Sequence, residues 1–353
     1  MRFAKVMTLV ALLGGCKFVT DAEYNDRATE LEASRTQFLP GSDQVNFLTA
    51  ADQRFYWVSL EKPLDAPLLH SIDPSTNVQV DYMFTMGMTN LATDYQMSGD
   101  LIVDCAEFDQ ATAYDAATGS MLDMTTQQDA SRCAVVGRDV YLQVSRKIMK
   151  WTPGQPTITQ VIDLDAQMVG TDQVAGLTGL GTQLLFGEGT RLWLMDVTTG
   201  KATWLENPDL TSGDIELDAN GVVYNTSNGP SYTAFADHSS FLLQDKVADG
   251  GYDLNHDYAD IQNVANSAEY ALIQDHIVYR GTRGIFAYGL DTTKVVDLLL
   301  DRGITSDDEF DAKPLYRAPS VTSDGTLFVQ DQSEDGDTTD RPVYRVELSG
   351  RLR

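Results

Sequence analysis

The stretch Leu184-Leu185-Phe186, followed by Trp193-Leu194-Met195-Asp196-Val197-Thr198-Thr199-Gly200-Lys201, contains two short hydrophobic strands and a hairpin turn. Asp in such a turn accepts hydrogen bonds from nearby amides, and Gly takes the left-handed conformation that closes it. Short hydrophobic runs of the first kind recur along the chain, with starts 46, 39, 44, 38, 55 and 50 residues apart. The seven runs are Phe55-Tyr56-Trp57-Val58, Leu101-Ile102-Val103, Val140-Tyr141-Leu142, Leu184-Leu185-Phe186, Val222-Val223-Tyr224, Ile277-Val278-Tyr279 and Leu327-Phe328-Val329.

A second strand and turn follow most of these runs, for example at Tyr114-Asp115-Ala116-Ala117-Thr118-Gly119 and at Leu290-Asp291-Thr292-Thr293-Lys294. The fifth copy is the least regular, around Thr233 to Ser239. Copies of about 40–50 residues are typical of four-stranded propeller blades, which bury their faces against one another and leave only short edges. We therefore predict an all-β fold with a single seven-bladed β-propeller over residues 44–353. A six- or eight-bladed propeller and an elongated β-solenoid are the alternatives.

Propellers are commonly closed by pairing one end of the chain with the blade at the other end. The last copy stops at Arg353, soon after its hairpin. We therefore expect the region near 35–48 to complete the last blade.

Composition excludes several classes of function. The 353 residues carry 25 Lys and Arg against 52 Asp and Glu, a formal net charge of −27. Nucleic-acid binding depends on clustered basic side chains, and so does docking on anionic lipid. Neither is expected here, and contact with a membrane is predicted only through a lipid anchor. Of the acidic residues 40 are Asp and 12 are Glu, a bias that favours turns over helices.

The N-terminus has the proportions of a signal peptide. Arg2 and Lys5 precede an apolar run of eight residues, Val6 to Leu13, which is far shorter than the ~20 residues of a membrane-spanning helix. The sequence Leu13-Gly14-Gly15-Cys16 resembles the bacterial lipobox. The resemblance implies cleavage after residue 15 and lipidation of Cys16. The residues that follow are polar and low in β-branched types, which predicts a tether over 16–43 with a short helix over 21–34. An ordinary secretory signal is the alternative.

The same resemblance points to the bacterial cell envelope. Lys17 occupies the place after the cysteine where some bacteria use Asp to retain a lipoprotein at the inner membrane, so the outer membrane is favoured. In an oxidising envelope the two remaining cysteines, Cys105 and Cys133, are expected to form a disulfide because their predicted strands belong to neighbouring blades. Two separate buried thiols are the alternative.

Two hairpins, Ala113 to Gly119 and Trp193 to Lys201, resemble the outer hairpin of PQQ-type propeller repeats. The tryptophan that commonly closes such a repeat is approximated by Trp204 but is missing from Met121-Leu122-Asp123-Met124. No quinone is therefore expected. The resemblance implies a propeller fold. In its anchor and its repeat the chain is similar to non-catalytic lipoprotein propellers, which act as scaffolds. One of these belongs to the outer-membrane protein assembly machinery.

One acidic segment has the alternating oxygen ligands of a calcium loop. In Asp253-Leu254-Asn255-His256-Asp257-Tyr258-Ala259-Asp260, the side chains of Asp253, Asn255, Asp257 and Asp260 could converge on one Ca²⁺. The segment is similar to the cation loop of FG-GAP propeller repeats but lacks the glycine after the third ligand. A solvated acidic loop is the alternative. No other cofactor is expected.

The four histidines lie in none of the common catalytic motifs. His70 and His238 are placed beside predicted hairpins, where solvent-facing polar residues are normal, and His276 begins a strand. The sequence therefore favours a non-enzymatic, lipid-anchored scaffold for envelope proteins. A module that binds a small ligand or a glycan, stabilised by calcium, is the second hypothesis. A propeller-type enzyme with its site at the central channel is the third.

Overall fold

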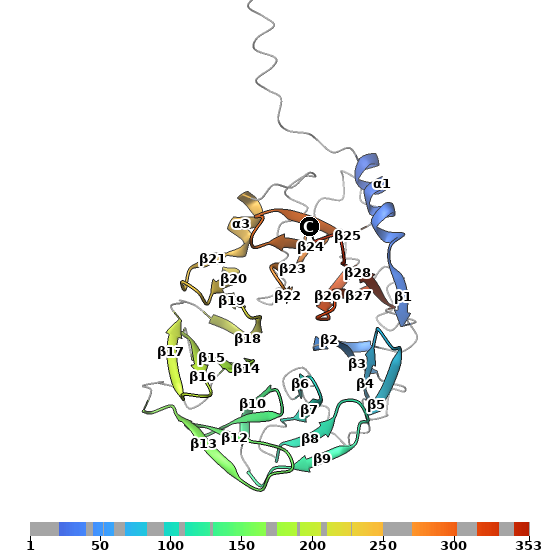
Figure 1. The fold of residues 1–353 in the computed structure, drawn as a ribbon. Coiled ribbons are helices and arrows are strands. Elements are labelled where there is room, and N and C mark those ends of the chain that lie inside the picture. Colours follow the sequence, from blue (N-terminus) through green and yellow to red (C-terminus); the bar gives the residue numbers. More distant parts are fainter. Residues whose placement is uncertain are drawn as a thin grey trace, which may run out of the picture.

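A computed structural model places seven four-stranded antiparallel sheets in a ring, so the protein is a seven-bladed β-propeller (Figure 1). This confirms the predicted fold class and blade number. The structure describes residues 21–39, 45–51, 53–59, 68–82, 95–105, 110–127, 130–166, 175–188, 191–205, 210–226, 228–249, 270–301, 316–331 and 342–352.

Each blade takes four strands, and blades 1 to 6 take them in chain order. Blade 1 contains β2(Val45–Ala51), β3(Arg54–Ser59), β4(Leu68–Asp73) and β5(Val78–Tyr82), and blade 2 contains β6(Tyr95–Ser98), β7(Leu101–Asp104), β8(Thr112–Asp115) and β9(Met121–Met124). Blade 3 contains β10(Ala130–Val136), β11(Asp139–Val144), β12(Lys147–Trp151) and β13(Ile158–Asp163), and blade 4 contains β14(Ala175–Leu180), β15(Gln183–Glu188), β16(Arg191–Asp196) and β17(Lys201–Leu205). Blade 5 contains β18(Leu210–Leu217), β19(Gly221–Thr226), β20(Gly229–Ala234) and β21(Ser240–Leu242), and blade 6 contains β22(Tyr270–Ile273), β23(His276–Gly281), β24(Gly284–Gly289) and β25(Val295–Leu300). Blade 7 contains β26(Tyr316–Val321), β27(Thr326–Asp331), β28(Val343–Glu347) and, from the start of the chain, β1(Thr36–Leu39).

The seven hydrophobic runs of the sequence all lie in the second strand of a blade. Successive side chains of a strand point to opposite faces, and in a propeller both faces pack against a neighbouring blade. In β19, Val222 and Tyr224 pack toward blade 4, whereas Val223 packs toward blade 6. This double burial explains why the runs are continuously apolar rather than alternating.

The ring is closed by β1, which pairs antiparallel with β28 through Thr36↔Arg345 and Gln37↔Tyr344. The closing strand therefore lies within the region near 35–48, as expected. The later part of that region, from Val45, forms the inner strand of blade 1 instead. Residues expected to act as a tether thus belong in part to the propeller itself.

In the described residues, two short helices accompany the blades: α1(Asp21–Glu32), near the start of the chain, and α3(Leu243–Asp249), after β21. In Figure 1 both lie at the outer rim around blade 6. Over the part of the chain that is described, neither helix is long or apolar enough to cross a membrane.

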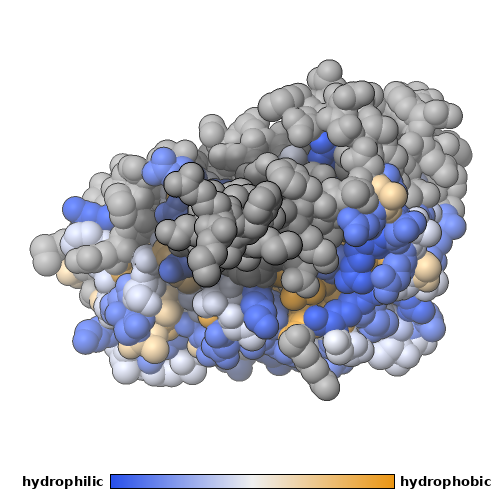
Figure 2. Space-filling view, turned by 90° about the horizontal axis from the view of Figure 1, so that it is seen from above, coloured by the Kyte–Doolittle hydropathy of each residue, from blue (hydrophilic) through white to orange (hydrophobic). Residues whose placement is uncertain are grey.

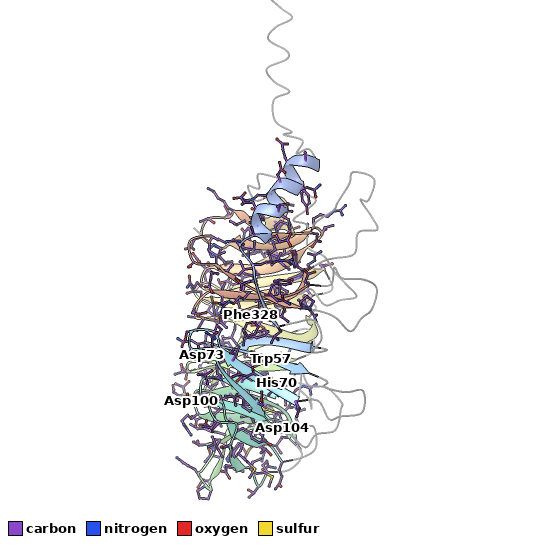
Figure 3. The ribbon with its side chains drawn as sticks, turned by 90° about the vertical axis from the view of Figure 1, so that its right-hand side faces the viewer. Trp57, His70, Asp73, Asp100, Asp104 and Phe328 are labelled. Atoms are coloured by element: carbon purple, nitrogen blue, oxygen red, sulfur yellow. A yellow bond between two sulfur atoms is a disulfide. The ribbon has the colours of Figure 1, made fainter. Side chains whose placement is uncertain are left out.

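The turns that join the first to the second strand and the third to the fourth strand of a blade lie on one face of the disc, where Figure 3 shows Asp73 and Asp100. Asp73, Asp115 and Asp196 each accept hydrogen bonds from turn amides two and three residues ahead, as the sequence predicts. Gly119 and Gly200 then take the left-handed conformation, with φ of 71° and 67°.

Candidate interaction surface and anchoring helix

Helix α1 is packed onto the propeller although few of its residues are apolar. Tyr24, Ala28 and Leu31 recur at helical spacing and are buried in one cluster with residues of blades 5 and 6, including Tyr288 and Val295. Such a stripe is what a surface helix needs to dock on a core. The helix therefore covers the outer strand of blade 6.

Polar contacts fix the helix in place. The hydroxyl of Tyr24, a residue 1% exposed, lies 3.0 Å and 2.9 Å from the carbonyl oxygens of Arg283 and Asp301. The Arg27 guanidinium donates to both carboxylate oxygens of Asp297 on β25, over 2.7 Å and 3.3 Å. These hydrogen bonds raise the pKa of Arg27. Bidentate pairs of this kind set orientation as well as attraction.

A second group of contacts follows at the end of the helix. Arg35 donates to Asp331 and Glu32, both over 2.5 Å, and to the Tyr316 hydroxyl over 2.9 Å. Its guanidinium also lies 3.8 Å from the centre of the Tyr344 ring. Burial alone would lower the pKa of Arg35, but these neighbours outweigh it and raise the pKa. Tyr24, Arg27 and Arg35 are hereafter called the α1 latch.

A buried ion pair lies next to the α1 latch. Arg280 donates to the Asp301 carboxylate over 2.5 Å and 3.1 Å, and both residues are 2% exposed. Because the backbone carbonyl of Asp301 also contacts Tyr24, this pair fixes the residue on which the helix rests. Seen face on in Figure 2, the rim that carries α1 is mostly hydrophilic where it is described.

The rim of blade 2 differs from that of blade 6. In β9, Met121 is 63%, Leu122 40% and Met124 50% exposed, and no residue of the strand is buried. These three side chains, hereafter called the β9 rim, account for half of the six large hydrophobic side chains exposed in the described residues; the others are Val78, Leu180 and Trp204. Flexible methionine side chains adapt to varied partners.

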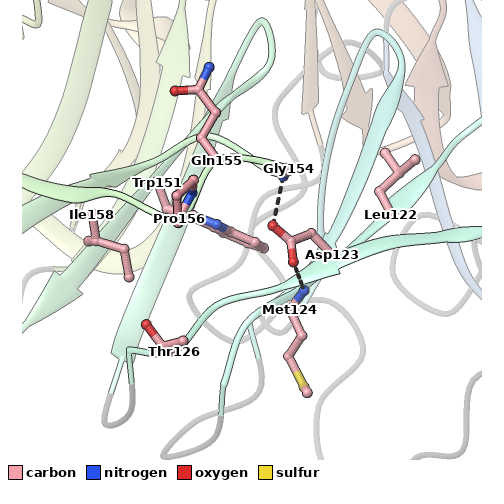
Figure 4. A pocket seen from close by; sticks show the side chains of 9 residues that line it. All are labelled: Leu122, Asp123, Met124, Thr126, Trp151, Gly154, Gln155, Pro156 and Ile158. Atoms are coloured by element: carbon pink, nitrogen blue, oxygen red, sulfur yellow. Dashed lines mark hydrogen bonds between the residues drawn. The ribbon is translucent and has the colours of Figure 1, made fainter.

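A shallow groove of about 290 Å³ runs beside β9, toward blade 3. Leu122, Asp123 and Met124 form one side, and Trp151, Pro156 and Ile158 form part of the other (Figure 4). The Asp123 carboxylate accepts hydrogen bonds from the Gly154 amide over 2.7 Å and from the Met124 amide over 2.8 Å. A hydrogen bond therefore joins blades 2 and 3 at this groove.

The predicted disulfide partners do lie together. The structure joins Cys105, directly after β7, to Cys133 on β10, with 5.9 Å between their Cα atoms. Both residues belong to the apolar cluster between blades 2 and 3. The crosslink thus connects neighbouring blades within their shared apolar interface.

The other predicted site residues lie outside the described residues. These are Cys16 and the calcium candidates Asp253, Asn255, Asp257 and Asp260. Among the residues that are described, no three His, Cys, Asp or Glu side chains come together as a metal site.

Two polar residues are buried in the blades, and one of them, His70, differs from its expected surroundings. His70 is 7% exposed, stacks on Trp57 and contacts Asp81 over 2.7 Å, so it is not a solvent-facing hairpin residue. Its position in β4 rather than in the turn accounts for this. Asp331 is likewise a buried charged residue, 2% exposed, because it ends β27 and pairs with Arg35. His276 packs at the start of β23 as expected and contacts Asp275 over 2.6 Å.

Comparisons with known proteins support the architecture only. No family model and no curated protein matches the chain. Among solved structures it is similar to the computationally designed Ika8 protein, with a TM-score of 0.50 and 11% identity over 88% of this chain and 98% of that one. BamB from Moraxella catarrhalis matches with a TM-score of 0.43 and 11% identity over 85% and 86% of the two chains. TolB from Acinetobacter baumannii matches with 0.42 and 15% identity over 56% and 53%. The chain is a β-propeller, and these likenesses define its class no further.

Proposed function

We propose that this protein is a lipid-anchored, non-enzymatic propeller that holds partner proteins at the bacterial cell envelope, with the outer membrane as the favoured site. The observation that carries the proposal is the α1 latch and its place in the sequence. Cys16, in the lipobox-like sequence, precedes Asp21 by only five positions. An extended chain spans at most about 3.6 Å per residue, so the link is at most about 18 Å long.

A lipid on Cys16 would therefore be attached close to a helix that is itself fixed to blade 6. Two acylation signals or a multiply acylated cysteine give stable anchoring without a spanning helix. The α1 latch would connect the lipid anchor to the propeller, because Tyr24, Arg27 and Arg35 join α1 to blades 6 and 7. An anchor joined to a rigid disc is suited to presenting a surface in a defined orientation.

The surface available for presentation is the β9 rim. Between blade 6 and blade 2 the ring contains two blades on one side and three on the other, so the two rims are nearly opposite (Figure 1). The blade 6 rim would face the membrane, and the exposed apolar side chains of blade 2 would face away from it. Single exposed hydrophobic residues are ordinary, but a group of them on a highly charged chain favours protein binding.

The test uses the full-length protein extracted from its own membranes. The mass of its N-terminal peptide is expected to show an acylated Cys16, and Cys16→Ser should release the protein from the membrane fraction. Gentle affinity purification after cross-linking should recover a stoichiometric protein partner. An unmodified Cys16 would refute the anchor. Recovery of the propeller alone would refute the scaffold and favour a ligand-binding module.

A further inference from the structure

The outer strands of blades 2 and 6 match position by position. In both blades a tyrosine, Tyr114 or Tyr288, is the next-to-last residue of the third strand, and five residues separate that strand from the outer one. The outer strand then begins apolar-apolar-Asp-apolar, with Met121-Leu122-Asp123-Met124 in β9 and Val295-Val296-Asp297-Leu298 in β25. Counted from the turn, the register shift comes after one residue pair in blade 2 and after three in blade 6, so it lies two pairs nearer the turn in blade 2. Asp123 therefore turns toward Gly154 of blade 3, whereas Asp297 turns toward Arg27.

The two strands differ in what covers them. In β25, Val295 is 6% exposed and lies in one cluster with the apolar side chains of α1. Leu298 is 0% exposed and packs toward blade 7. Met121 and Met124, at the matching positions, are 63% and 50% exposed. Among the described residues no helix lies on β9. The chain thus contains one apolar outer strand with its covering helix and a second one with its apolar side chains uncovered.

A helix fits the β9 rim better than an added strand. Strand addition needs free backbone groups along an edge, but β9 has only four residues and its Met124 amide already donates to the Asp123 side chain. A short edge with an occupied donor offers few main-chain hydrogen bonds. A helix needs only side-chain contacts, and apolar grooves lined with methionine bind helices through their apolar face.

Charge indicates the kind of helix. The chain has a net charge of −27, which disfavours association of two copies and attracts a basic partner. Near the β9 rim the Asp115 and Asp123 carboxylates lie in the hairpin and the strand, and each Asp123 oxygen retains a second lone pair after accepting one amide. In blade 3, the basic side chains of Arg146 and Lys150 are paired with Asp165 and Asp139.

We propose that the β9 rim binds an amphipathic, basic helix of a partner protein, whose apolar face covers Met121, Leu122 and Met124 as α1 covers β25. The inference rests on the proposed scaffold function only in requiring a partner. It specifies where that partner binds and what chemistry its binding segment has.

The test measures binding of synthetic helices to the full-length protein in detergent at physiological salt. The probe is an 18-residue peptide with Leu at positions i, i+3, i+4 and i+7 and Lys elsewhere; one comparison peptide replaces Lys by Glu, and another has the same composition with the Leu residues scattered. The variant is Met121→Ser/Leu122→Ser/Met124→Ser, which changes no charge. Leu180→Ser is the matched control, because Leu180 is similarly exposed, at 42%, on blade 4.

The basic amphipathic peptide is expected to bind the wild type and Leu180→Ser equally and the triple variant at least ten-fold more weakly. The Glu peptide and the scattered peptide should bind the wild type at least ten-fold more weakly as well. Equal affinity for the wild type and the triple variant would overturn the proposal. So would a dimer of the wild type, in sedimentation, that the triple variant does not form, because the occupant would then be a second copy.

These outcomes are separable from failure of the scaffold function. Peptide binding does not require an acylated Cys16. A native partner that co-purifies equally with the triple variant would leave the scaffold intact and overturn the β9 assignment.

Discussion

Replacement of Tyr24 by Ala tests whether α1 is an integral part of the propeller. The side chain is 1% exposed, is packed among residues of blades 5 and 6, and contacts two backbone carbonyl oxygens through its hydroxyl. Truncating a buried aromatic side chain to Ala typically costs about 3–5 kcal/mol of unfolding free energy. Removing the hydroxyl alone, in Tyr24→Phe, is expected to cost about 1 kcal/mol.

The decrease in unfolding free energy caused by Tyr24→Ala cannot exceed the free energy with which α1 docks on the propeller. Once the helix has detached, the substitution destabilises the remaining fold no further. Urea denaturation of the full-length protein gives the total change, and hydrogen exchange separates the two cases. We expect the amides of α1 to exchange faster in Tyr24→Ala, with those of β11 in blade 3 unchanged.

Asp26→Ala is the matched control, because Asp26 is exposed on the same helix. The reasoning is refuted if Tyr24→Ala and Asp26→Ala have the same unfolding free energy and the same exchange rates in α1. Such a result would mean that the helix contributes nothing to the stability of the blades, and that the latch does not fix the N-terminus.

Three further predictions concern the rest of the chain. Cys105→Ser/Cys133→Ser should lower the unfolding free energy by about 3–4 kcal/mol, because the crosslink spans 28 residues; no difference from the oxidised wild type in urea denaturation would argue against a bond. Calcium should raise the melting temperature of the wild type but not that of Asp257→Ala. An equal response of the two proteins would refute the hypothesis that residues 253–260 form a calcium loop. Burial raises the pKa of Tyr141 and of Tyr232 to about 12 from 10.0, with smaller contributions from acidic neighbours. Because both hydroxyls lose their protons more readily when unfolded, stability should fall as the pH rises from 10 toward 12; Tyr141→Phe should lessen that fall in alkaline denaturation curves, and an unchanged pH dependence would contradict it.

The blades were predictable because their signal is local. Each second strand is apolar on both faces, and an Asp and a Gly mark the turn that follows the third strand, as at Asp196 and Gly200 after β16. Burial between neighbouring blades then follows from the repeat. The closing strand was predictable in outline for the same reason, since the last copy lacks one strand.

The α1 latch was not predictable from the sequence. Arg27 and Asp297 are 270 residues apart, and Arg35 and Asp331 are 296 apart, so no local pattern joins them. The helix carries only a weak apolar stripe, and Tyr24 completes it only because blade 6 lies beneath. Likewise, methionine is a residue type common in protein cores, so the sequence does not reveal that Met121 and Met124 are exposed. Their exposure depends on which segments cover β9.

The central claim is that the anchor and the binding surface lie on opposite rims of one rigid propeller. Photo-crosslinking in intact cells tests it most directly, with a short diazirine side chain placed at Asp26 on α1 or at Leu122 on β9. The account predicts lipid adducts at position 26 and none at position 122, and a protein adduct at position 122. Lipid adducts at position 122, or a protein adduct at position 26 alone, would contradict it.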